Sequence, residues 1–410
     1  MPLPGLKSLS TRIQSNIAPR LRRVTSSGLF IPEVDGLRFI AIASVVLFHL
    51  TSPLVGNSGG GFSPPLGQDP VARILQKGNI GVRLFFVLSG FLLALPFATY
   101  HLNQGPPVSL RSYYLRRVTR IEPPYLISLL ALFVLLVLQQ KAVYPLIPHL
   151  LASTFYVHNL VYGDGSTINF VAWSLEVEVQ FYLIAPTLAL LFGIRSVALR
   201  RSLIGSLVLI FTAIRYYCLL KEANRGLLSI FGYGQFFAAG FMLADFYLVS
   251  PVRIGKPALY WDIVSFIGWP MFILSLQSEK ALFWTQPLFI FTLYLAVFRG
   301  AWLKKALSNP LVTSIGGMCY SIYLIHFVVI GSVWKLTGNF RAGNTFSSNF
   351  LLQSLLMLPA ILLICTGFYL LIEKPCMHTA WPALLVKWAG HKTRKQTKDS
   401  EIGTTLRFNK

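Results

Sequence analysis

The sequence contains few charged residues, and acidic residues are the scarcest of them. Asp, Glu, Lys and Arg make up 12% of the 410 residues, whereas globular domains average roughly 25%. A soluble domain cannot cover its surface with so few charges, and the composition equally excludes a disordered chain or a coiled coil. Because 54% of the residues are hydrophobic, we expect an all-α polytopic membrane protein.

Cysteine is also scarce. The four cysteines are scattered, mostly through apolar runs, and no two have a CxxC spacing; they are Cys218, Cys319, Cys365 and Cys376. This distribution excludes a disulfide framework and a cysteine-based metal site. We therefore expect the cysteines to pack among apolar side chains, and we expect no bound metal.

The 14 acidic residues are outnumbered by 36 basic ones, which gives a formal net charge of +22. In a soluble protein this excess would suggest a nucleic-acid partner. Beside membrane spans, however, Lys and Arg accumulate in the cytosolic loops. We therefore expect the lipid bilayer, and no nucleic acid, to be the partner of these residues.

Ten apolar runs approach the roughly 20 residues that a helix needs to cross a bilayer. Segment 143–161 is apolar too, but Pro145 and Pro148 interrupt it, so we expect an interfacial or re-entrant piece there. The sequence thus predicts about ten transmembrane helices. The runs are 35–52, 79–98, 123–140, 169–193, 202–220, 227–249, 258–277, 282–299, 311–334 and 348–373.

The basic residues divide unevenly between the two sides of this arrangement. If the N-terminus is cytosolic, 25 Lys and Arg residues lie in cytosolic segments and 9 on the opposite side. Since basic residues are retained in the cytosol, we expect both termini to be cytosolic. The chain then divides into a basic cytosolic arm over 1–28, a transmembrane domain over 29–376 and a basic cytosolic tail over 377–410.

Ionisable residues inside the spans are functional candidates, because charge within a bilayer is costly. In the first span Arg38 and His49 are eleven residues apart. That spacing places them on one helix face, about three turns and roughly 16 Å apart. An arginine that reaches for the interface, or a packed histidine, would explain either residue alone, but the shared face favours a joint function.

Arginines also mark the second and third spans. The second contains Arg83, which can reach the interface, and Ser89, which with the following glycine favours close helix packing. Arg117 and Arg120 precede the third span, in an expected loop before a helix that Pro123 opens. Their spacing turns both guanidinium groups one way, which suits phosphate binding. The positive-inside rule would place arginines here as well, and both explanations stay open.

The fourth and ninth spans add polar side chains at a similar depth. The fourth begins with Glu176, Glu178 and Tyr182, and the ninth contains His326. Counting residues along the spans predicts one polar layer above a cytosolic mouth. The layer contains His49, Glu178 and His326, and the mouth is lined by Arg38, Arg117 and Arg120.

The motifs that carry these residues resemble the integral-membrane acyltransferases of family three, the O-antigen and exopolysaccharide O-acyltransferase type. The similar stretches follow in the family's order over residues 31–376. They are Asp35-Gly-Leu-Arg38 with His49, Gly81-Val-Arg83 through Ser89-Gly90, Arg117-Val-Thr-Arg120, Trp173-Ser-Leu-Glu176-Val-Glu178 through Tyr182, Tyr320-Ser-Ile-Tyr323-Leu-Ile-His326 and Glu373-Lys-Pro375.

The resemblance implies transfer of an acyl group, usually acetyl, from a cytosolic acyl-CoA such as acetyl-CoA, with no bound cofactor. The implied acceptor is a hydroxyl of a sugar, a glycan or a lipid-linked carbohydrate, and the implied location is the bacterial inner membrane. Some relatives continue into a further extracytoplasmic domain. Since 35 residues follow Pro375, we expect the stand-alone membrane form.

The resemblance also implies roles for individual residues. His49 and Glu178 match the catalytic positions, and Arg38, Arg117 and Arg120 match the donor-binding ones. Glu176 stands where the family often has a small or neutral residue, so the choice between the two carboxylates stays open. It also stays open whether His49 is a general base or is transiently acylated. Further oxyanion or acceptor contacts are expected from Arg83, Ser89, Glu176, Tyr182 and His326.

Two other classes of function compete with acyl transfer. A glycolipid or small-molecule transporter or flippase also uses intramembrane charges and basic mouths, although no paired half-sequence repeat favours it. A non-catalytic membrane assembly partner would not need Arg38 and His49 on one helix face.

The charge asymmetry makes a testable prediction about topology. Reporter fusions at residues 160 and 340 should report the extracytoplasmic side, and a fusion after Lys410 should report the cytosol, because the basic loops are retained inside. Alkaline phosphatase and green fluorescent protein fusions measure this directly. An extracytoplasmic C-terminus would overturn both the topology and the predicted polar layer.

Overall fold

The computed structural model describes residues 23, 30–57, 62–139, 142–249, 258–276, 283–377 and 381. Regular secondary structure in these ranges is helical throughout. Eight stretches are long and apolar enough to cross a membrane, which confirms the expected all-α polytopic membrane fold. They are Pro32–Gly56, Pro70–Asn103, Leu110–Leu138, Phe170–Gly193, Val197–Leu220, Asn224–Val249, Cys319–Thr337 and Phe346–Cys376.

The two remaining expected spans are shorter helices that pack against each other, α13 (Leu259–Ser275) and α14 (Gln286–Arg299). The described residues therefore contain eight helices long enough to cross a bilayer, against the about ten expected, and α13 and α14 stand at the other two positions with 17 and 14 residues. Nearly all of the predicted arms at 1–28 and 377–410 lies outside the described residues, and so do both termini.

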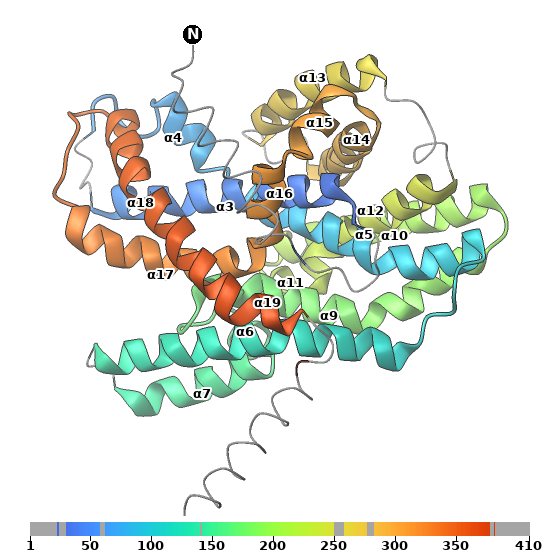
Figure 1. Ribbon diagram of the computed structural model, residues 1–410, viewed down its shortest axis with the longest axis horizontal. Coiled ribbons are helices and arrows are strands. Elements are labelled where there is room, and N and C mark those ends of the chain that lie inside the picture. The colour runs from blue at the N-terminus through green and yellow to red at the C-terminus, as the bar shows by residue number, and fades with distance from the viewer. Residues whose placement is uncertain are drawn as a thin grey trace, which may run out of the picture.

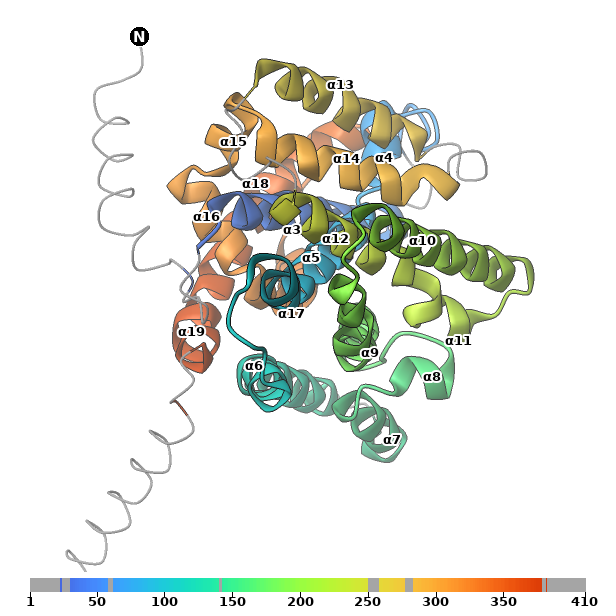
Figure 2. The ribbon, with the colours of Figure 1, turned by 90° about the vertical axis from the view of Figure 1, so that its right-hand side faces the viewer.

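The first half of the chain forms helices α3 to α12. These are α3 (Pro32–Asn57), α4 (Pro70–Leu75), α5 (Ile80–Asn103), α6 (Leu110–Leu138), α7 (Val143–Thr154), α8 (His158–Tyr162), η2 (Phe170–Ala172), α9 (Trp173–Leu188), η3 (Ala189–Gly193), α10 (Val197–Leu220), α11 (Asn224–Leu227) and α12 (Ile230–Val249). Helices α3, α5 and α6 run across the view of Figure 1. In Figure 2 several helices are seen nearly end-on, with α6 and α7 at one edge of the bundle and α13 at the opposite edge.

After α13 and a short turn, η4 (Phe283–Thr285), the chain continues through α14 to a second group of helices. These are α15 (Trp302–Leu307), α16 (Pro310–Gly317), α17 (Cys319–Thr337), α18 (Phe346–Phe368), η5 (Tyr369–Glu373) and α19 (Lys374–Cys376). The predicted ninth span is thus divided between α16 and α17. Helix α3 packs against α5 on one side and against α16 and α17 on another, so it connects the two groups.

The arginine-rich stretch before the third span is helical, contrary to our expectation of a loop. Helix α6 begins at Leu110, where Ser109 caps it, and continues through Pro123 and Pro124. Proline removes a backbone donor and usually kinks or ends a helix, but membrane helices tolerate it when neighbouring groups satisfy the backbone. Arg117 and Arg120 therefore lie on a helix, one turn apart.

The apolar segment 143–161 contains a pair of histidines outside the eight long spans. Its helix α7 packs along α6 and continues through Pro148. His149 Nδ1 lies 2.8 Å from His158 Nε2, and both rings pack against the tilted ring of Tyr162. Burial lowers the pKa of His158, while a hydrogen bond to the Asp164 carbonyl opposes that shift. The pair joins α7 to α8.

The centre of the bundle is the contact between α5 and α12, which two glycines make close. A Cβ on Gly240 would lie 2.3 Å from the Val87 carbonyl oxygen, and one on Gly90 would lie 2.3 Å from that of Phe237. The aromatic rings of Phe181 and Phe237 stack beside this contact with centroids 4.0 Å apart. Small residues at such crossings let helix backbones approach. The packing role predicted for the second span is therefore carried by Gly90.

Because α5 and α12 are in such close contact, one added methyl group should lower the stability of the protein substantially. Gly240→Ala should lower the free energy of unfolding by roughly 1–3 kcal/mol, because backbone atoms of α5 must move away. Thermal unfolding of the purified protein in detergent measures the change. The matched control is Gly331→Ala in α17, where an added Cβ meets no atom within 4 Å. Equal stability of the two variants would contradict the close contact.

Candidate active site

Two histidines from distant parts of the chain meet inside the bundle. His49 on α3 and His326 on α17 approach with Nδ1 of His49 2.7 Å from Nε2 of His326. His326 is fully buried and His49 is 9% exposed. The rings of Phe48 and Phe327 flank His49 with centroids 5.1 and 5.2 Å away. The apolar surroundings favour neutral imidazoles, because burial penalises the charged form.

The backbone of α17 fixes the protonation pattern of this pair. Nδ1 of His326 lies 2.7 Å from the Ile322 carbonyl oxygen and 3.0 Å from that of Tyr323. A carbonyl oxygen only accepts, so Nδ1 of His326 must carry the hydrogen. Neutral His326 then accepts at Nε2, and His49 must donate from Nδ1. We infer that Nε2 of His49 carries a lone pair.

Glu178 does not contact the partner that we expected. Its Oε1 accepts a hydrogen bond from the Ser89 hydroxyl at 2.5 Å, and the next turn of α9 places Tyr182 beside it. We expected this carboxylate in one layer with His49, as the group that orients the imidazole. In the structure α5 packs against both α3 and α9, so Glu178 meets a hydroxyl of α5. His326 occupies the orienting position at Nδ1 of His49.

Glu176, two residues earlier, points to a different neighbourhood. Its Oε2 accepts from the backbone N–H of Asn159 at 2.8 Å. The Asn159 side chain in turn donates to the carbonyl oxygens of Trp173 and Leu228. Glu176 is fully buried. Two residues on a helix differ by about 200°, so only one carboxylate can face a given site, and Glu176 holds the start of α8 against α9.

Two of the three predicted donor-binding arginines, Arg38 and Arg120, gather with Arg23 near two acidic side chains. Arg38 donates to Asp35 Oδ1 at 2.7 Å, and Arg23 Nε lies 3.5 Å from the same oxygen. Arg120 is within electrostatic range of Arg23 and of Glu373. The three arginines thus converge from α3, α6 and the segment before α3.

Arg117, one turn before Arg120 on α6, lies against aromatic rings of α6 and α9. Its guanidinium carbon is 3.6 Å from the centroid of the Tyr113 ring and 5.6 Å from that of Tyr182. One of its N–H groups donates to the Tyr113 carbonyl oxygen at 2.7 Å. Glu178 is within electrostatic range of both Arg117 and Arg38. The carboxylate therefore lies near both groups of arginines.

Arg83 and Glu373 each join two helical segments. Arg83 donates to Gln286 at 2.5 Å and so joins α5 to α14. Glu373 is fully buried and accepts from the backbone N–H of Ser321 at 3.0 Å and from its hydroxyl. We did not predict Glu373 as a site residue, although a carboxylate ahead of Lys-Pro at the end of an apolar span was the available signal. In the part of the chain that the structure describes, no three His, Cys, Asp or Glu side chains converge to hold a metal ion.

The different roles of Glu176 and Glu178 can be tested by measuring the thermal stability of variants. Glu176→Ala leaves the buried N–H of Asn159 without an acceptor, which should cost about 1–3 kcal/mol. Glu176→Gln retains an acceptor oxygen and should restore most of the loss. Glu178→Gln is the matched change on the opposite face. Thermal unfolding in detergent measures all three, and a wild-type melting temperature for Glu176→Ala would refute the assignment.

Comparison with known proteins gives this arrangement a family. Residues 31–370 match a family model described as an acyltransferase domain, family three. A Staphylococcus aureus protein named "Putative O-acetyltransferase SACOL0978" is 25% identical over 335 residues, which is 74% of this chain and 51% of that protein. The chain thus spans about half the length of this relative.

Two further relatives carry related names. The peptidoglycan O-acetyltransferase OatA of Listeria monocytogenes is 31% identical over 185 residues, 42% of this chain and 26% of that protein. The O-acetyltransferase OatA of S. aureus is 24% identical over 331 residues, 73% of this chain and 51% of that protein. No solved structure matches the chain. Because the family model covers residues 31–370, the chain belongs to this family of integral-membrane acyltransferases.

Proposed function

We propose that the protein is a membrane-embedded O-acyltransferase of the bacterial inner membrane. It moves an acyl group, most simply acetyl, from a cytosolic acyl-CoA to a hydroxyl of a sugar, a glycan or a lipid-linked carbohydrate. The family supports the reaction type, and the names of the relatives support acetyl as the group and carbohydrate as the acceptor class. The observation that carries the chemistry is the oriented pair of His49 and His326.

The first step of this proposal is removal of a proton from the acceptor hydroxyl. Nε2 of His49 has the lone pair that this step needs, because its Nδ1–H is committed to His326. As His49 takes the proton it becomes an imidazolium, and the acceptor nitrogen of His326 stabilises the new charge. The carbonyl groups behind His326 keep that nitrogen unprotonated. A fixed hydrogen-bonded partner behind a catalytic histidine is the general way to hold such a base.

The same lone pair also suits an acylated histidine. In that variant of the mechanism Nε2 of His49 attacks the thioester carbon and CoA leaves as the thiolate. In a second step the acceptor oxygen attacks the acyl carbon, the bond from that carbon to Nε2 breaks, and the hydroxyl proton neutralises the CoA thiolate. Both mechanisms need an unprotonated Nε2 on His49, and both need His326 as the acceptor at Nδ1. They differ in whether an acyl-enzyme forms without acceptor.

The donor is placed by the arginines at the other end of the site. Arg38 lies eleven residues before His49 on α3, and the long arm of acyl-CoA can span the roughly 16 Å between them. Arg117 and Arg120 add two guanidinium groups on one face of α6, which suit the phosphates of CoA. We assign Glu178 to hold Arg38 and Arg117 in position, since it lies within range of both.

A transfer assay with two variants of His326 tests this proposal. Purified protein in liposomes is given radiolabelled acetyl-CoA and a chitooligosaccharide acceptor. His49→Ala should reduce transfer roughly 100- to 10,000-fold, because it removes the base. His326→Gln keeps an acceptor for the His49 Nδ1–H and should retain more activity than His326→Ala, which does not.

Donor binding is the control for these variants. All three should bind CoA as the wild type does, since the arginines are unchanged. An active His49→Ala enzyme would exclude His49 from the chemistry. A wild-type protein that moves a labelled glycolipid across the liposome without acylating it would instead support the transporter alternative.

A further inference from the structure

Two phenylalanine rings lie beside the histidine pair and are exposed. Phe327 follows His326 on α17, and its ring is nearly perpendicular to that of His49, with centroids 5.2 Å apart. Phe170 in η2 lies next to it, with ring centroids 6.0 Å apart and an angle of 36° between the planes. The exposed fractions of Phe170 and Phe327 are 52% and 37%. The two rings, which we call the aromatic surface, thus adjoin the candidate base.

Hydrogen bonds between η2 and α17 hold the aromatic surface in place. The Tyr323 hydroxyl donates to the Val171 carbonyl oxygen at 2.5 Å, and the Asn169 side chain donates to the Leu324 carbonyl oxygen at 3.3 Å. Asn169 and Val171 flank one phenylalanine of the surface, while Tyr323 and Leu324 lie about one turn before the other. The surface is therefore fixed relative to the histidine pair, as a preorganised binding site requires.

The chain around the aromatic surface indicates a space that water can enter. The seven residues before η2, 163–169, are not helical, and Asn169 bonds to the Leu324 carbonyl, two residues before His326. Irregular backbone at membrane depth is either buried in protein or lines a water-filled cavity. Because Phe170, directly after this segment, is 52% exposed, the second alternative applies.

The same space continues along α17. Gly331 lies one turn after Phe327, and a Cβ added to it would meet no atom within 4 Å. Ligand sites are typically lined by aromatic side chains, with few polar groups that fix orientation. A sugar ring matches this composition, because its C–H face is apolar and its hydroxyl groups project from the edge. Stacking removes the apolar face from water and leaves a hydroxyl free to reach the histidine.

We propose that Phe170 and Phe327 bind the acceptor, with a pyranose ring of the acceptor stacked on the aromatic surface. The stacked ring presents the reacting hydroxyl to Nε2 of His49. This inference rests on the proposed function, which supplies a carbohydrate hydroxyl as the acceptor, and it adds the place where the sugar binds. The two phenylalanines then determine which acceptors are used, while the arginines of the cytosolic mouth hold the donor.

Steady-state kinetics with acetyl-CoA and a chitooligosaccharide test the proposal on the purified full chain in detergent. Phe170→Leu and Phe327→Leu should each raise the KM for the chitooligosaccharide about tenfold, equivalent to about 1.4 kcal/mol. The KM for acetyl-CoA should not change. Phe170→Tyr keeps an aromatic face and should retain the wild-type KM. Leucine is as compatible with lipid as phenylalanine is, so rings that only face lipid would tolerate both changes.

The matched control is Phe266→Leu on α13, at a phenylalanine that is 84% exposed. It should leave both KM values unchanged, and the proposal fails if Phe170→Leu behaves like it. For Phe327→Leu, a lower kcat with an unchanged KM for the chitooligosaccharide would show that this ring only packs against His49. That result would also overturn the shared surface.

A binding measurement separates this inference from the proposed function. In saturation-transfer difference NMR, irradiation of the protein should transfer magnetisation to the ring protons of the chitooligosaccharide. The transfer should persist in His49→Ala and be lost in the Phe170→Leu, Phe327→Leu double variant. A wild type that transfers no acetyl group but shows this pattern would overturn the proposed function and retain the carbohydrate site. Equal magnetisation transfer in the wild type and the double variant would overturn the carbohydrate site, whether or not the enzyme is active.

Discussion

A polar group within a bilayer-spanning bundle has to find its partner inside the protein, and that constraint arranges the site described here. The carbonyl groups of α17 lie where they must be to accept from His326, and the remaining nitrogen of His326 is then available only as an acceptor. His49 completes the series as a donor. The protonation state that His49 needs for its proposed role is thus set by backbone carbonyl groups of another helix. The packing of α3 against α17 is what brings that helix within reach.

The fold was predictable because the bilayer imposes a length on each apolar run. All eight long spans coincide with predicted runs, and the two shorter helices fill the remaining places. The error at α6 has a physical origin. Pro123 and Pro124 read as a helix start because proline suits the first turn, yet proline is also tolerated inside membrane helices. The sequence does not show which neighbours satisfy the backbone, and so the true start at Leu110 was missed.

The site was predictable in depth but not in lateral arrangement. Counting residues from the membrane edge gives a similar level for His49, Glu178 and His326, whereas contact depends on which helices are adjacent. Because α5 packs against both α3 and α9, Glu178 contacts Ser89. The opposite directions of Glu176 and Glu178 follow from the helical period alone. Which of them faces the arginines depends on the rotation of α9, and no local pattern specifies that rotation.

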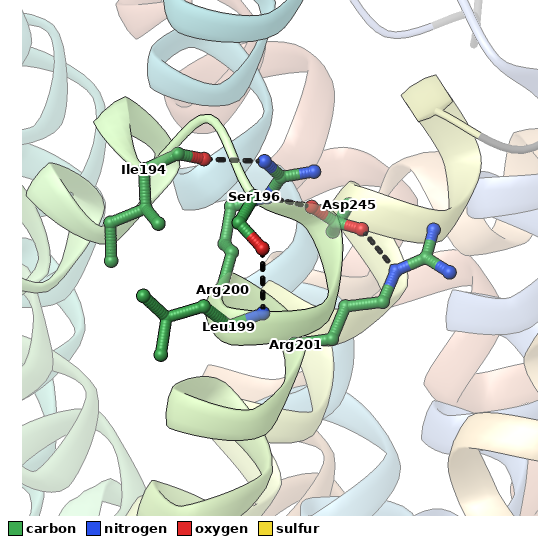
Figure 3. A network of polar contacts seen from close by, with 6 residues as sticks. All are labelled: Ile194, Ser196, Leu199, Arg200, Arg201 and Asp245. Carbon is green, nitrogen blue, oxygen red and sulfur yellow. Dashed lines mark hydrogen bonds and ion pairs between the residues drawn. The ribbon is translucent and has the colours of Figure 1, made fainter.

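Because acidic residues are scarce, a single buried carboxylate often lies near more than one arginine. Asp35 organises Arg38 and Arg23, while Glu373 lies within range of Arg38 and Arg120. At the start of α10, Asp245 pairs with both Arg200 and Arg201 (Figure 3). Where carboxylates and guanidinium groups are equal in number, they mainly hold helices together. Where guanidinium groups are in excess, the protein retains positive charge that an anion can complete. In the proposed mechanism, the phosphates of the donor would neutralise the excess of guanidinium groups beside Asp35, in a sequence that has 36 basic residues and 14 acidic ones.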